Sequence, residues 1–180
     1  MCDILEAPYF SAPPARLEKV HPMNELPQSA QKVAQALQSA TLDVSIVQMP
    51  SSTRTAEDAA NACQCHPSQI VKSLVFQGKT TKSPLLLLVS GTNRVNVKGV
   101  AGSIGEALSR PDADFVRTVT GFAIGGIPPL GHATHLKTYF DRDLLQYDVV
   151  WAAAGTPDCV FSVDPARLAE AANAEIIDVC

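Results

Sequence analysis

The chain has 180 residues, of which 46% are apolar and 18% are charged, and its formal net charge is −4. This length suits one domain with a buried core, and the composition argues against an intrinsically disordered chain. The slight acidity argues against a protein that coats nucleic acid non-specifically.

The N-terminal third divides into an irregular part and the start of a compact domain. Residues 1–27 carry five prolines and show little periodicity, which indicates a Pro-rich extension. We expect the domain to occupy residues 28–180. It is predicted to open with a helix from about residue 29 to 40, capped by Ser29, and to continue with a strand within 43–50.

Two apolar segments dominate the middle of the chain. Before them, Thr55 is predicted to cap a helix that carries two carboxylates in its first turn. Residues 69–76 and 84–91 are then separated by a polar, glycine-containing link, which predicts a hairpin of two largely buried strands. Residues 96–110 are weakly helical and interrupted by glycines.

The C-terminal third predicts two strands, within 149–155 and 159–164, and then a helix in which Asp164 is the cap and Pro165 the first residue. Residues 175–179 predict a last strand. Because strands and helices do not alternate regularly, we expect an α+β (mixed α/β) fold. Its core would be a curled, barrel-like mixed sheet with helices outside.

Charge, apolar runs and cysteines bear on location and partners. No apolar run approaches the about 20 residues that span a bilayer, and the N-terminus lacks the pattern of a secretory signal. We therefore expect a cytoplasmic protein with reduced cysteines and no membrane partner. Residues 59–105 contain five basic residues and no acid, so this segment could face phosphates or could be ordinary solvated surface.

Lys72 is the one charged residue of an otherwise apolar predicted strand, "IVKSLVF". Burying an ammonium is costly unless it reaches a cavity or an anion. Lys72 is therefore either a cation that grips a phosphate, carbonyl or carboxylate in a pocket, or a lysine whose ammonium extends to solvent.

Residues 120–132, "TGFAIGGIPPLGH", place four glycines and two prolines in thirteen positions. Glycine permits close approach and positive φ, while proline fixes φ. The spacing matches neither a dinucleotide nor a P-loop motif. It is consistent with a cradle of backbone N–H groups at Gly125, Gly126 and Ile127 that would stabilise an oxyanion, or with a structural loop of tight turns.

Histidines and cysteines offer weaker candidates. His132 is expected to form a polar wall of the pocket. The "CQCH" segment at residues 63–66 has the wrong spacing for a zinc site, so we expect no metal. A metal or redox function based on this segment remains a third hypothesis.

Six ordered segments resemble the YbaK/prolyl-tRNA synthetase-associated domain family of aminoacyl-tRNA editing proteins. The resemblance covers residues 30 to 178, and its segments are "STRTAEDAA", "QIVKSLVF", "SGTNRVN", "TGFAIGGIPPLGH", "WAAAGTP" and "FSVDPARLAE".

The resemblance implies hydrolysis of the ester of a mischarged aminoacyl-tRNA, in trans to the synthetase, with tRNA-Pro or a related tRNA as the expected acceptor and no cofactor. Lys72 would anchor the substrate, and Gly125 and Gly126 would surround its carbonyl. The expected substrate-binding residues are Ile127, Pro128, Pro129, His132, Asn93 and Gly155. The partners would be the aminoacyl-tRNA acceptor end and an aminoacyl-tRNA synthetase.

One departure affects the substrate. Relatives inserted in prolyl-tRNA synthetases carry a histidine shortly after the residues that correspond to Ala154 and Gly155, whereas this chain continues "TPDCVF". Alanine specificity therefore does not carry over. The competing interpretation is a non-catalytic module that binds a tRNA end, a nucleotide or a synthetase.

Overall fold

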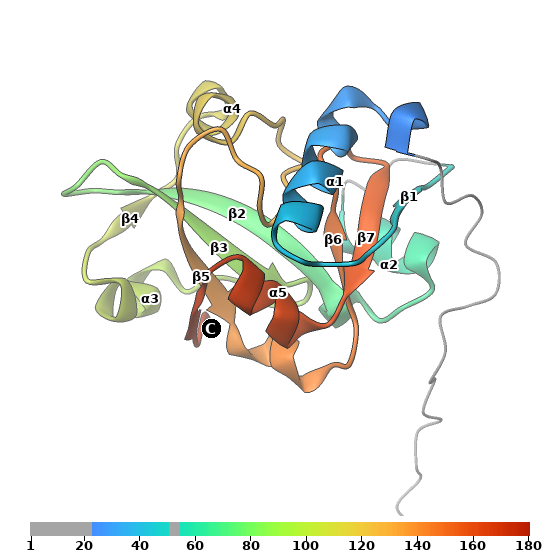
Figure 1. The fold of residues 1–180 in the computed structure, drawn as a ribbon. Coiled ribbons are helices and arrows are strands. Elements are labelled where there is room, and N and C mark those ends of the chain that lie inside the picture. Colours follow the sequence, from blue (N-terminus) through green and yellow to red (C-terminus); the bar gives the residue numbers. More distant parts are fainter. Residues whose placement is uncertain (1–22, 51–54) are drawn as a thin grey trace, which may run out of the picture.

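The computed structural model describes residues 23–50 and 55–180, and most of the predicted N-terminal extension lies outside these residues (Figure 1). The helices are α1 (Gln28–Ser39), α2 (Ala56–Cys63), α3 (Val97–Ile104), α4 (Ala113–Thr120) and α5 (Pro165–Ala171). The strands are β1 (Ile46–Gln48), β2 (Ile70–Gly78), β3 (Pro84–Ser90), β4 (Leu108–Ser109), β5 (Lys137–Asp141), β6 (Val150–Ala153), β7 (Cys159–Val163) and β8 (Glu175–Ile177). Short 3-10 turns are η1 (Met23–Glu25), η2 (Pro67–Gln69) and η3 (Arg142–Gln146).

The strands form one mixed sheet in the order β1-β7-β6-β2-β3-β5-β8, with β4 paired to β2. The neighbours β2 and β3 are antiparallel, as the hairpin prediction requires, whereas β2 pairs with β6 and β3 with β5 in parallel. The described residues thus confirm the predicted mixed α/β fold, a mixed sheet with helices around it.

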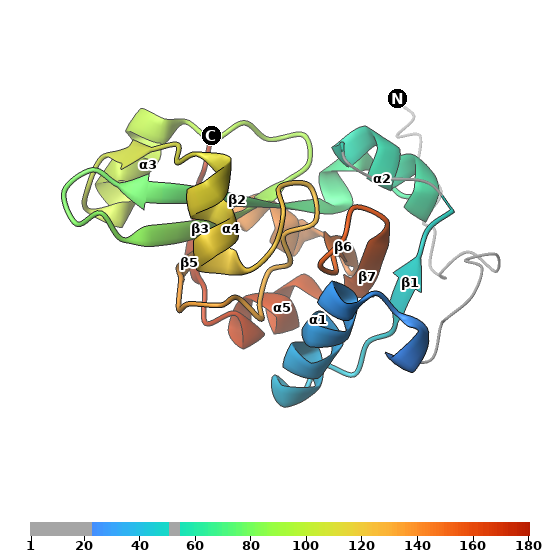
Figure 2. The same cartoon turned by 90° about the horizontal axis from the view of Figure 1, so that it is seen from above.

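The β2–β3 hairpin is the centre of the molecule. Leu86 to Val89 of β3 are fully buried, because β3 lies between β2 and β5 and side chains pack on both faces of the sheet. Figures 1 and 2 show α3 beside one end of this hairpin and α2 at the other end, with α1 and α5 packed around the shorter strands.

Two of the three predicted helix caps are present. The Thr55 hydroxyl accepts a hydrogen bond from the Asp58 N–H, and Asp58 in turn accepts from the Thr55 N–H. Asp164 accepts from two backbone N–H groups at the start of α5. The prediction for Ser29 is wrong: α1 begins at Gln28, so Ser29 lies inside its first turn, and Pro27 at the cap position makes no side-chain bond.

Three elements were not predicted. The helix α4 begins where Asp112 accepts a hydrogen bond from the Phe115 N–H, and β4 and β5 complete the sheet around β2 and β3. Ahead of α1, Leu26 is buried in the main core. The core therefore includes a residue that precedes residue 28, where the domain was predicted to begin. The domain boundary itself remains a prediction.

Candidate functional site

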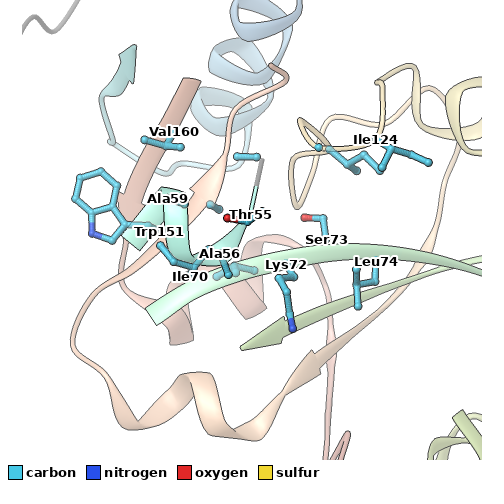
Figure 3. Close-up of a pocket in the computed structure, with 15 residues that line it drawn as sticks. Thr55, Ala56, Ala59, Ile70, Lys72, Ser73, Leu74, Ile124, Trp151 and Val160 are labelled. Carbon is cyan, nitrogen blue, oxygen red and sulfur yellow. The ribbon is translucent and has the colours of Figure 1, made fainter. Parts of the chain in front are cut away.

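A pocket of approximately 320 Å³ lies between α2, the strands β2, β6 and β7, and residues 120–132, which we call the glycine-proline loop (Figure 3). Lys72, Gly125 and Ile127 are the predicted site residues that line it. The other lining residues are Thr55, Ala56, Ala59, Ile70, Val71, Ser73, Leu74, Ile124, Trp151, Ala152, Ala153 and Val160. Among the described residues the lining is therefore mostly apolar, with no carboxylate and no histidine.

Lys72 lines the pocket from β2. Its ammonium donates a hydrogen bond to the carbonyl of Asn93, and it points to the opposite side of the strand from Ile124 of the loop (Figure 3). Burial lowers the pKa of Lys72, an effect that the Asp141 carboxylate opposes and the Arg94 guanidinium reinforces. Lys72 and the loop thus share one pocket, but the ammonium as placed is not directed at the loop.

Asn93, a predicted substrate-binding residue, does not line this pocket. Its side-chain amide donates to Asp141 at 2.9 Å and to Asp143 at 2.7 Å, while its carbonyl accepts from Lys72. Asp141 is 1% exposed and also accepts from the Ser90 N–H at 3.0 Å. Because these bonds fix the turn after β3, Asn93 holds the Lys72 ammonium through its backbone.

The glycine-proline loop makes a tight turn against the residues that follow β6. Gly125 has φ +96°, a conformation that favours glycine. The N–H of Gly126 donates to the Ala123 carbonyl at 3.1 Å, so it is engaged within the loop. No hydrogen bond among the described residues takes the N–H of Gly125 or Ile127. Of the predicted N–H cradle, the N–H groups of these two residues therefore have no hydrogen-bond partner in the described structure.

The far end of the loop is fixed by His132. Its Nε2–H donates to the carbonyl of Pro128 at 2.8 Å, and its ring meets Phe122 edge-on. Pro128 and Pro129 are themselves buried. Pro128, Pro129 and His132 were predicted to bind substrate, but none of them lines the pocket. As placed, they stabilise the loop and do not contact the pocket interior.

The environment of His132 gives stability a specific dependence on pH. Burial lowers its pKa below the ordinary 6.5, although the Pro128 carbonyl opposes this effect. An unfolded chain therefore binds the proton first as the pH falls below about 6.5, and the folded state loses stability in that window. We expect His132→Gln to lose less stability than the wild type between pH 7 and pH 5 in urea unfolding. Equal losses in the two proteins would contradict this account.

Gly155 is also placed away from the pocket. Its φ is +92°, and a Cβ there would lie 2.7 Å from the Ser29 carbonyl oxygen and 3.1 Å from the Phe122 ring. The glycine therefore allows the segment after β6 to pack against α1 and against the loop. Its predicted role in substrate binding has no support from this geometry.

Several pocket residues were not predicted. Thr55 was recognised only as a helix cap, and Trp151 and Ser73 only as members of strands. Asp141, which accepts from Asn93 but does not line the pocket, is the last residue of β5, a strand that was not predicted. Alternation along β2 was the available signal for Ser73: adjacent residues of a strand face opposite sides of the sheet, so Ser73 faces the side away from Lys72.

The "CQCH" segment has a structural explanation. Within residues 23–50 and 55–180 no three His, Cys, Asp or Glu side chains are grouped to hold a metal. His66 caps η2, where its Nδ1 accepts from the Ser68 N–H. A hydrogen bond with Cys65 and burial both raise the pKa of Cys63, which disfavours a thiolate at Cys63. The same hydrogen bond lowers the pKa of Cys65. No described helix is long and apolar enough to cross a membrane.

Comparisons with known proteins agree on one family. The aminoacyl-tRNA editing domain matches residues 50–171. YwhH of Bacillus subtilis (strain 168) is 28% identical over 136 residues, which cover 75% of this chain and 86% of YwhH. EbsC of Enterococcus faecalis (strain ATCC 700802 / V583) is 24% identical over 129 residues, which cover 69% of this chain and 76% of EbsC. Its name describes it as a proposed Cys-tRNA(Pro)/Cys-tRNA(Cys) deacylase.

A solved structure is more similar. The crystal structure of a protein described as a proposed trans-editing enzyme for prolyl-tRNA synthetase superimposes with a TM-score of 0.81 at 44% identity. The match covers 86% of this chain and 98% of that protein. It extends the likeness to the arrangement of the whole described domain.

Proposed function

The chain belongs to the aminoacyl-tRNA editing domain family, and we propose that it is a trans-editing deacylase. Its substrate would be a small amino acid esterified to the 3′-terminal adenosine of a mischarged tRNA, with tRNA-Pro as the acceptor. The observation that carries this proposal is the pocket shared by Lys72, Gly125 and Ile127. The names of the relatives, which refer to prolyl-tRNA synthetase and to Cys-tRNA(Pro), support the choice of tRNA.

The open N–H groups of the loop suit ester hydrolysis. A water molecule attacks the ester carbonyl carbon, and the N–H groups of Gly125 and Ile127 stabilise the oxyanion that forms. The bond from the carbonyl carbon to the ribose oxygen then breaks, and that oxygen takes the proton released by the water. The products are the free amino acid and the uncharged tRNA. No protein nucleophile is needed, since an ester requires only a positioned water and a stabilised oxyanion.

Lys72 serves as the anchor for the terminal nucleotide. Its four-carbon stem is flexible, so the ammonium can exchange the Asn93 carbonyl for a phosphate or ribose oxygen of the substrate. A substrate phosphate offers a full negative charge, whereas a carbonyl offers only a dipole, so binding favours this exchange.

Basic residues indicate where the tRNA would approach. Lys79, Lys82, Arg94 and Lys98 are exposed on the β2–β3 turn and the segment that follows β3. Lys79 and Lys82 lie at the turn of the hairpin that carries Lys72, whereas Arg94 follows β3 and Lys98 lies in α3. Exposed cations of this kind attract a phosphate backbone. We propose that the acceptor end binds here in the cytoplasm, with a synthetase as a further partner.

The deciding experiment is deacylation of tRNA-Pro charged in turn with Ala, Cys, Ser, Thr or Pro. We expect rapid loss of one or two small non-cognate esters and slow loss of the prolyl ester. Binding of these tRNAs without hydrolysis of any of them would overturn the enzyme assignment and favour a non-catalytic tRNA-binding module.

A further inference from the structure

Ser73 carries a polar group that the fold leaves unused. Its hydroxyl is buried and has no hydrogen-bond partner among the described residues. The hydroxyls of Tyr139 and Thr156 share this condition, but neither of those residues lines the pocket, whereas Ser73 does. An unpaired buried hydroxyl destabilises a fold. Because Ser73 lines the pocket, a water or a bound ligand there can supply its partner, and a substrate that does so displaces the water.

The position of Ser73 indicates which part of a substrate it meets. In Figure 3 its side chain lies on the loop side of β2, toward Ile124, while the neighbouring Lys72 and Leu74 point to the other side. The loop that would hold the ester carbonyl is therefore on the same side as the hydroxyl. A group joined to that carbonyl carbon, such as the aminoacyl side chain, lies within the reach of Ser73.

The α-amino group of the substrate is a poorer partner. It is a cation at neutral pH, and the described lining contains Lys72 and no carboxylate to neutralise a second positive charge. A desolvated, unpaired ammonium is costly, so the α-amino group is better placed toward solvent. The aminoacyl side chain then faces the apolar wall on the Ser73 side of the sheet, formed by Val71 and Ala152, in which Ser73 supplies the hydroxyl.

We infer that Ser73 determines specificity by hydrogen bonding the hydroxyl of a seryl or threonyl ester, so that these esters are preferred to the alanyl ester. This inference rests on the proposed function. Serine and alanine differ only by that hydroxyl. Of the two hydroxyl side chains that line the pocket, Thr55 already caps α2, whereas Ser73 has no protein partner. With alanine bound, the Ser73 hydroxyl stays unpaired, as it is in the free protein, so the alanyl ester gains nothing from it while the seryl ester gains a hydrogen bond.

The test compares seryl and alanyl esters of the same tRNA-Pro in wild type and Ser73→Ala. We expect kcat/KM for the seryl ester to exceed that for the alanyl ester by about tenfold in the wild type. Ser73→Ala should lower the seryl value by about tenfold and leave the alanyl value within about twofold. An unchanged ratio, or an equal loss on both esters, overturns the inference.

Stability provides a second readout that a structural role would change. Ser73→Ala removes a hydroxyl with no partner and should not lower the melting temperature. The matched control Ser109→Ala removes a hydroxyl that donates to the Gln77 carbonyl at 3.1 Å and should lower it. Equal destabilisation of the two variants would mean that Ser73 has a protein partner, and would overturn the inference. If the wild type hydrolyses neither ester nor the rest of the panel, the proposed function fails as well.

Discussion

Lys72→Ala is expected to slow deacylation of the preferred ester by about 10- to 100-fold, the loss that follows from removing one hydrogen bond to a charged group. The variant keeps the loop and the apolar wall but has no cation to anchor the terminal nucleotide. Single-turnover deacylation with enzyme in excess measures the chemical step, and its dependence on enzyme concentration measures binding. Because Lys72 acts as an anchor, most of the loss should appear in binding.

The matched control is Lys32→Ala, since Lys32 is an exposed lysine of α1 that lies outside the pocket and outside the proposed tRNA-binding residues. It should alter deacylation far less than Lys72→Ala does. Lys72→Ala should also fold normally, because burial disfavours the ammonium that the variant lacks. If the Lys72→Ala protein deacylates and binds tRNA as the wild type does, Lys72 is not part of the site. The glycine-proline loop must then account for catalysis without it.

The fold was predictable where local pattern determines structure. The hairpin of β2 and β3 follows from two apolar runs around a polar link, and the Thr55 and Asp164 caps follow from local side-chain chemistry. The helix α4 and the strand β5, which flank the glycine-proline loop, were not predicted. The strand β5 forms because it pairs with β3. The two segments are far apart in the sequence, so local sequence patterns do not reveal this pairing.

The candidate site was predictable only in part. Lys72 stands out because a charge interrupts an apolar strand, and the loop stands out by composition. Gly155 and Asn93 show what the sequence does not distinguish. A glycine that allows close packing of a neighbouring helix cannot be told, from sequence, from one that allows close approach of a ligand. The contact of Asn93 with Asp141 joins residues 48 positions apart, so its positioning role becomes visible only in the folded chain.

Gly126→Ala is expected to disable the loop. A Cβ at residue 126 would lie 2.8 Å from the Cα and carbonyl carbon of Thr156. This is backbone that cannot rotate away, so the loop itself must move. A displacement of about 1 Å at a catalytic group can cost about 100-fold in rate. We therefore expect deacylation to fall by about that factor, with a loss of about 1 to 3 kcal/mol in stability from overpacking.

Gly102→Ala is the matched control for this substitution. Gly102 lies within α3, and a Cβ there would meet nothing within 4 Å. Alanine should stabilise the helix by about 0.5 to 1 kcal/mol and leave the rate unchanged. Rates are compared well below both melting temperatures, so that each reports folded protein. If Gly126→Ala deacylates at the wild-type rate, the close approach to Thr156 is not needed to place Gly125 and Ile127. The oxyanion must then be stabilised by other groups.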